Sequence, residues 1–269
     1  MTDLVVWGGP VYAPGGAPKG VGIADIADVA WANPTEILTL SGNGSSYFSS
    51  LAASWKDPVT GRILPALLRE NGKRAEDYEH IAIAGFSAFH GLASQLLATD
   101  GDMIDAAVLI DSCFSAFPGY AGKEGYVEFG KLAAAGDRLM VMSSSAGRNN
   151  PPLPPSTSGS ECAYQSFVDA AGSKYSWFDV PPPLPEISAY STGDGRSLRS
   201  RGLYLLDYGS QFTHQQHIHQ LSNELLQTFL VPYLAGDTSL TGQSEFKVSY
   251  LVAAAAVAAG LYFVFRQTR

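Results

Sequence analysis

The stretch His80-Ile-Ala-Ile-Ala-Gly-Phe-Ser-Ala-Phe-His-Gly91 decides the fold class of this chain. Its first half is a short apolar run, which is typical of a buried β-strand. The residues after Ser87 continue in a helical pattern that runs through Leu92, Leu96 and Leu97. Ser87 therefore lies on a predicted turn between a strand and a helix. Such a turn presents a side chain at the mouth of a sheet, beside the N–H groups of the helix start.

Apolar runs and helical patterns alternate along the chain after about the first thirty residues. We expect strands at residues 36–40, 106–110, 138–142 and 202–206, and helices at residues 63–71, 129–135 and 216–234. Strands that alternate with helices favour right-handed crossovers and a mostly parallel central sheet with helices on both faces. The predicted fold class is α/β, with one domain over residues 1–235.

Composition and charge narrow the classes of function. Hydrophobic residues make up 46% of the chain and charged residues 16%, which is enough apolar material for a full core. The formal net charge is −8 and the first 245 residues contain no basic cluster, so we expect no binding to nucleic acid. Cys113 and Cys162 form neither a metal-ligand pattern nor a disulfide framework.

The C-terminal end has the pattern of a membrane anchor. Residues 248–265 carry no charge, with Lys247 before them and Arg266 and Arg269 after them. A helix of this length spans about 27 Å, which is just enough to cross a hydrocarbon core. The alternative is a buried last helix of the globular domain. We expect a polar linker, a transmembrane helix and a basic tail at residues 236–247, 248–265 and 266–269.

The start of the chain lacks the basic and apolar pattern of a signal peptide, so the simplest topology is a single-pass tail anchor. In that topology the globular domain lies in the cytoplasm. Arg266 and Arg269 lie beyond the predicted helix and favour the opposite orientation under the positive-inside rule, so the orientation stays open.

The chemistry depends on whether Ser87 has partners. A serine hydroxyl is a poor nucleophile at neutral pH and needs a base, which an acid orients in turn. In an open parallel sheet, reactive groups gather at the C-terminal ends of the strands. Asp111 directly follows the predicted strand at residues 106–110, and three histidines follow the one at residues 202–206. The chain order of serine, acid and histidine is that of enzymes with a Gly-x-Ser-x-Gly elbow.

Three segments in this order resemble the α/β-hydrolase superfamily, in particular its bacterial esterase- and lipase-like members. They are Gly85-Phe-Ser-Ala-Phe-His-Gly91, Ala106-Ala-Val-Leu-Ile-Asp-Ser112 and His217-Ile-His-Gln-Leu221. The resemblance covers about residues 30–235. It rests on the order of the predicted strands, helices and motifs along the chain more than on identical residues. It implies a Ser–His–acid triad and an oxyanion hole, with no metal and no organic cofactor.

Carried onto this sequence, the resemblance makes Ser87 the nucleophile and the backbone N–H of Ala88 one oxyanion donor. The second donor would come from the loop after the earlier strand, residues 41–44. Gly42 or Asn43 is the expected residue there.

More than one residue is a candidate for the base and for the acid. His217 resembles the late histidine of the family and is the preferred base, with His214 as the runner-up and His219 on another helical face. Asp111 is the preferred acid because its strand fixes its distance from the sheet edge. Glu161, on a later excursion of the chain, is the alternative acid.

Phe89 stands where the elbow motif has a small residue that lets helix and strand approach closely. We expect its ring either to push them apart or to point into the pocket.

The predicted function is a membrane-anchored serine hydrolase that cleaves an ester, thioester or amide through an acyl-enzyme on Ser87. Its partners would be a small-molecule or lipid-like acyl substrate and, through the C-terminal helix, a membrane. The alternative is a non-catalytic α/β-hydrolase-like binding or scaffold protein tethered to a membrane or viral envelope.

Overall fold

The computed structural model describes residues 2–11, 29–42, 45–112, 123–144, 178–179, 196–208 and 221–242. The strands are β1 (Thr2–Val11), β2 (Thr35–Gly42), β3 (Tyr78–Phe86), β4 (Ala106–Ile110), β5 (Leu139–Ser144), β6 (Phe178–Asp179), β7 (Arg196–Ser200) and β8 (Leu203–Asp207). The α-helices are α2 (Ser45–Trp55), α3 (Leu64–Glu70), α4 (His90–Asp100), α5 (Lys123–Ala135) and α8 (Val231–Leu234). Shorter helical turns are η1 (Ala75–Asp77), η2 (Ser87–Phe89), η7 (Leu226–Leu230) and η8 (Thr238–Thr241).

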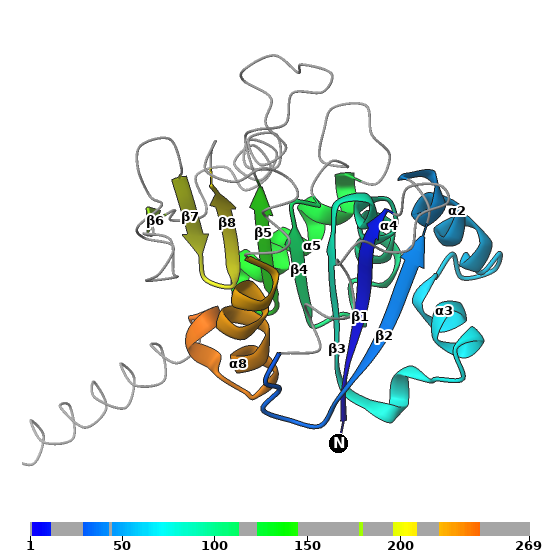
Figure 1. The fold of residues 1–269 in the computed structure, drawn as a ribbon, viewed down its shortest axis with the longest axis horizontal. Helices are drawn as coiled ribbons and strands as arrows, with labels where there is room; N and C mark the ends of the chain where they lie inside the picture. The colour runs from blue at the N-terminus through cyan, green and yellow to red at the C-terminus, as the bar shows by residue number, and fades with distance from the viewer. Residues whose placement is uncertain are drawn as a thin grey trace, which may run out of the picture.

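The described strands form one eight-stranded sheet in the order β2-β1-β3-β4-β5-β8-β7-β6. The six strands from β2 to β8 run parallel, and β7 and β6 are added antiparallel at one side. The C-terminal ends of the parallel strands therefore share one edge, which is the upper edge in Figure 1. This confirms the predicted α/β class with a mostly parallel sheet.

Helices cover both faces of the sheet. Successive strand residues alternate between two cores, because neighbouring side chains of a strand point to opposite faces. In β1, Leu4 and Val6 pack with α2 to α5, whereas Val5 and Trp7 pack with residues 221–234. Figure 1 accordingly shows α5 behind the sheet and α8 in front of it. The predicted covering of both faces is confirmed.

The predicted strand at residues 106–110 has the same bounds in the structure as β4. The structure adds β1, β6 and β7, which the apolar patterns did not predict. It also extends β2 through Ser41 and Gly42, two residues that we expected in a loop. Because β1 lies between β2 and β3, β2 is an edge strand of the sheet.

The predicted helix at residues 216–234 is present wherever the structure describes it, from residue 221 onward. It contains the π-helical turn η7 directly before α8, which carries Pro232. Proline has no N–H to donate to the preceding turn and its ring crowds a carbonyl there. A widened turn before the proline accommodates both effects.

The folded unit continues past residue 235. The Tyr204 hydroxyl donates to Leu240 O at 3.0 Å and Arg199 donates to Ser239 O at 2.9 Å, so η8 is fastened to β7 and β8. No helix within the described ranges is long and apolar enough to cross a membrane. The predicted transmembrane segment, residues 248–265, lies outside the described residues.

Candidate functional site

Ser87 occupies the sharp turn that leads from β3 into η2 and α4. Its φ is +52°, in the left-handed region that non-glycine residues rarely adopt, whereas Phe86 before it is extended with φ −121°. The change reverses the chain within one residue and leaves Ser87 half-buried at the C-terminal edge of the sheet. The sequence predicted a serine on a turn between a strand and a helix at this position, and the structure adds the strained backbone angle.

Asp111 leaves the neighbouring strand at the same level. Phe86 pairs with Ile110 in the parallel register of β3 and β4, so Ser87 and Asp111 are the next residues on adjacent strands. Adjacent strands lie about 4.8 Å apart. Asp111 is buried and also has a left-handed φ, of +43°. Its N–H donates to Ser143 O of β5 at 2.8 Å, which ties the turn to the next strand.

The main chain around Ser87 suits the stabilisation of negative charge. Ala88, the predicted oxyanion donor, is buried in the first helical turn, where N–H groups have no intrahelical acceptor. The positive end of the helix dipole lies at the same place.

Gly42, one of the two expected second oxyanion donors, does not lie on a strand next to β3. Gly42 is the last residue of β2 and pairs with Val11 of β1, so a complete strand separates it from β3. Two strand spacings amount to about 10 Å. Asn43 lies outside the described residues. On the side of β2, the strand that adjoins β3 is β1, where Gly8 pairs with Gly85.

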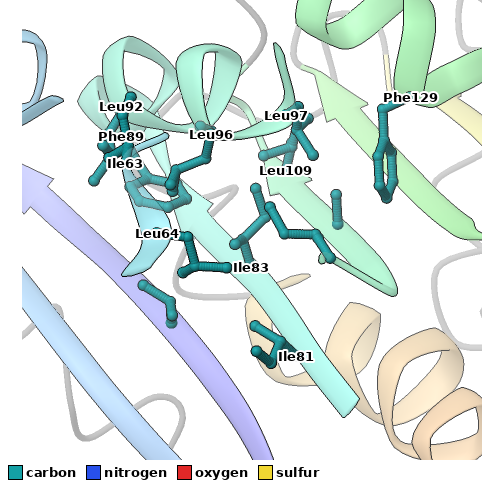
Figure 2. Packing of buried hydrophobic residues seen from close by; sticks show 14 of the residues in the cluster. Ile63, Leu64, Ile81, Ile83, Phe89, Leu92, Leu96, Leu97, Leu109 and Phe129 are labelled. Atoms are coloured by element: carbon teal, nitrogen blue, oxygen red, sulfur yellow. The ribbon is translucent and has the colours of Figure 1, made fainter. Parts of the chain in front are cut away.

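The ring of Phe89 neither opens the elbow nor lies in a pocket. It is fully buried and packs edge-on against Phe48 of α2, with ring centroids 5.6 Å apart and planes at 85°. Figure 2 shows it among the side chains of the core cluster, which also includes Ile63 and Leu92. The phenyl ring therefore belongs to the core beneath the elbow.

Two glycines make room for this ring. A Cβ atom at Gly8 would overlap the Phe89 ring, and one at Gly85 would lie 2.7 Å from both Phe89 Cγ and Gly8 O. The motif keeps helix and strand close by a small residue on the helix. Here the small residues are on the two strands, and the large residue is on the helix.

Other predicted site residues lie outside the described residues: His214, His217, His219 and Glu161. The segment that carries the three histidines follows β8, whose last residue, Asp207, pairs with Ser144 at the same sheet edge, whereas Glu161 lies between β5 and β6 in the sequence. In the part of the chain that the structure describes, no three His, Cys, Asp or Glu side chains gather closely enough to hold a metal ion.

The residue next to Asp111 is one that the sequence did not single out. The buried Ser112 hydroxyl donates to the carbonyl oxygen of Ser87 at 2.9 Å, across the gap between the ends of β3 and β4. A lone serine after an acid has no local pattern that predicts such a long-range bond. The only signal in the sequence was its place at the end of a predicted strand.

Comparison with protein-family models, with curated protein sequences and with solved structures gave no match to this chain.

The packing of Phe89 on Gly8 can be tested by a double-mutant cycle. Gly8→Ala should lower the free energy of unfolding by about 1–3 kcal/mol, because the new methyl group overlaps the Phe89 ring. In a Phe89→Ala background the same change should cost nothing or stabilise the protein, because it fills part of the space that the ring leaves. Urea unfolding measures each free energy.

Gly9→Ala is the matched control, because a Cβ atom there would meet its nearest neighbours at an ordinary 3.8 Å. Equal costs for Gly8→Ala with and without the Phe89 ring would contradict this account of the elbow.

Proposed function

We propose that this protein is a serine hydrolase of the α/β-hydrolase superfamily, which cleaves an ester, thioester or amide through an acyl-enzyme on Ser87. The observation that carries the proposal is the left-handed φ of +52° at Ser87, on a turn between parallel strand β3 and helix α4. Such strain in a non-glycine residue persists where the surrounding structure holds it, and it concentrates at active sites.

The order of the sheet supports the proposal. Strands β3, β4, β5 and β8 are consecutive neighbours and all parallel, so Ser87, Asp111 and the chain after β8 start from one edge. Three strand spacings from β8 to β3 amount to about 14 Å. An extended chain covers about 3.3 Å per residue, so the stretch from Asp207 to His217 is long enough to bring an imidazole to Ser87.

The proposed reaction follows from these positions. His217 takes the proton of the Ser87 hydroxyl as Oγ attacks the acyl carbonyl, and the Asp111 carboxylate orients the imidazole and stabilises its charged form. The N–H of Ala88 donates to the oxyanion of the tetrahedral intermediate. The imidazolium then protonates the leaving group, and a water activated by His217 releases the acyl group from Ser87.

For the second oxyanion donor we now favour the main chain that follows β1, since β1 adjoins β3 and β2 does not. Gly42 and Asn43 remain candidates only if the chain after β2 bends across the end of β1. The proposal needs no metal and no organic cofactor.

We further propose that residues 248–265 anchor the enzyme to a membrane as a single-pass tail, with the globular domain in the cytoplasm. The absence of charge from this segment supports the proposal. The attachment of η8 to β7 and β8 means that the folded body includes η8. An enzyme held at a membrane surface is suited to a lipid-like acyl substrate.

The nucleophile is tested with a fluorophosphonate probe, which reacts with activated serines. The wild-type protein should be labelled on Ser87, and Ser87→Ala should abolish labelling. Ser54→Ala is the matched control and should label like the wild type, because Ser54 is an exposed residue of α2 whose hydroxyl bonds only to Leu51 O. A folded wild-type protein that does not react would overturn the proposal.

The base is tested by comparing two histidines. His217→Gln should slow labelling by about a thousandfold or more, as the loss of a triad base does, whereas His214→Gln should change the rate by less than tenfold. Labelling of the wild type should increase with pH as the imidazole loses its proton, because only the neutral ring accepts a proton. The reverse order of the two variants would assign the base to His214.

The anchor is tested by truncation after Gly242, which preserves η8. Full-length protein should sediment with membranes and require detergent for release. The truncated protein should stay in the supernatant and keep the labelling rate of the full chain. Full-length protein in the detergent-free supernatant would contradict the anchor without affecting the assignment of Ser87.

A further inference from the structure

Tyr126 of α5 places its hydroxyl between the two turns of the candidate site. The side chain is buried, and its Oη atom lies 3.2 Å from His90 O and 3.1 Å from Ser112 O. Both neighbours are carbonyl oxygens, so the hydroxyl is the donor and its single proton is shared between them. His90 opens α4, just after the Ser87 turn, and Ser112 directly follows Asp111.

Ser112 completes the connection. Its carbonyl accepts from Tyr126, while its own hydroxyl donates to Ser87 O at 2.9 Å. These three hydrogen bonds, together with the covalent structure of Ser112, connect Ser87 through Ser112 and Tyr126 to His90. We call these bonds the Tyr126 bracket. It holds the turn after β3 and the turn after β4 from one point on α5.

The bracket acts where the backbone is strained. Ser87 and Asp111 both have left-handed φ angles, of +52° and +43°, and neither is glycine. A residue in this conformation relaxes unless several contacts together fix it. The bracket supplies such contacts to Ser87 directly and to Asp111 through its neighbour Ser112.

A close approach of two helices sets the reach of Tyr126. A Cβ atom at Gly125 would overlap Ser94 O and lie 2.7 Å from Ala98 N, both in the backbone of α4. Only glycine permits this distance between α4 and α5. The approach brings Tyr126, the next residue, against the first turn of α4, where it meets His90 O.

We propose that Tyr126 and Ser112 are positioning residues of the hydrolase, which fix the separation of the Ser87 and Asp111 turns. This inference rests on the proposed function of Ser87. It deepens that function by naming what keeps nucleophile and acid in register. The two strained turns lie on separate strands, and Tyr126 of a third element, α5, bonds to the main chain beside each of them. A displacement of about 1 Å between reacting groups can cost about a hundredfold in rate.

The test compares Tyr126→Phe with Tyr204→Phe. Tyr204 is a matched control, because it is a buried tyrosine whose hydroxyl also donates to the backbone, here to Leu240 O, and it joins β8 to η8 rather than the two turns. Both variants keep the ring and lose one hydroxyl. Tyr126→Phe should slow fluorophosphonate labelling by about tenfold or more and lower kcat for a p-nitrophenyl ester without raising KM. Tyr204→Phe should leave both unchanged.

Ser112→Ala provides a second variant, which removes only the bond to Ser87 O. It should also slow labelling and lower kcat, and it replaces Tyr126→Phe in the test if that variant does not fold. Equal labelling rates and equal kcat for the wild type, Ser112→Ala and Tyr126→Phe would overturn the proposal. So would an equal loss in the Tyr204→Phe control, since the effect would then be one of general stability.

Amide hydrogen exchange separates this inference from the proposed function. Tyr126→Phe should speed exchange at residues 87–90 and 111–112, and Tyr204→Phe should not. If the wild type does not react with the probe, the hydrolase proposal fails, and a positioning role in that reaction fails with it. The exchange comparison then still decides the physical claim: selective exchange supports the bracket, and equal exchange in the two variants overturns it.

Discussion

The left-handed backbone of Ser87 is the constraint on which the rest of the candidate site depends. It reverses the chain at the end of β3 and starts the helix that continues as α4. Because β3 lies inside a parallel sheet, this reversal exposes the serine at the edge where the neighbouring strands also end. A serine with ordinary backbone angles at this position would continue the strand, and its hydroxyl would not stand beside the N–H groups of the helix start.

Two kinds of contact hold this turn: packing of the Phe89 ring in the core below it, and hydrogen bonds from side chains beside it. From below, the Phe89 ring fills the hollow over Gly8 and Gly85, so the first helical turn packs directly on two strands. Full burial of such a ring contributes about 1.5–3 kcal/mol, comparable to the cost of the strained backbone. From the side, Ser112 and Tyr126 bond to the main chain of the turn. The core packing and the hydrogen bonds act on the same few residues.

Local pattern was sufficient for the elements that carry Ser87 and Asp111. The run Ala106–Ile110 is uninterrupted and apolar, and its bounds were predicted without error. Strand β1 was not predicted, because Gly8 and Gly9 interrupt its apolar run. Its position between β2 and β3 is a long-range property, which no local spacing expresses. The expected oxyanion donor at Gly42 followed from that missing strand.

The role of Phe89 could not be predicted for the same reason. Whether a large residue fits on the helix depends on Gly8, which is far away in sequence and pairs with Gly85 only in the folded sheet. The side chains that join the two turns, Ser112 and Tyr126, likewise meet only once α5 packs on α4. Sequence pattern identified the reactive residues that end strands, while tertiary packing determines what holds them.

The central claim is that Ser87 carries the acyl group during turnover. The most direct measurement is mass spectrometry of the full-length protein, quenched with acid while it hydrolyses a p-nitrophenyl ester and then digested. The account predicts a mass increase of one acyl group on the peptide that contains Ser87, which disappears when the substrate is exhausted. The account would be contradicted if the ester is hydrolysed while the acyl group is found on another residue. It would also be contradicted if no acylated peptide is found under conditions in which release of the acyl group is rate-limiting.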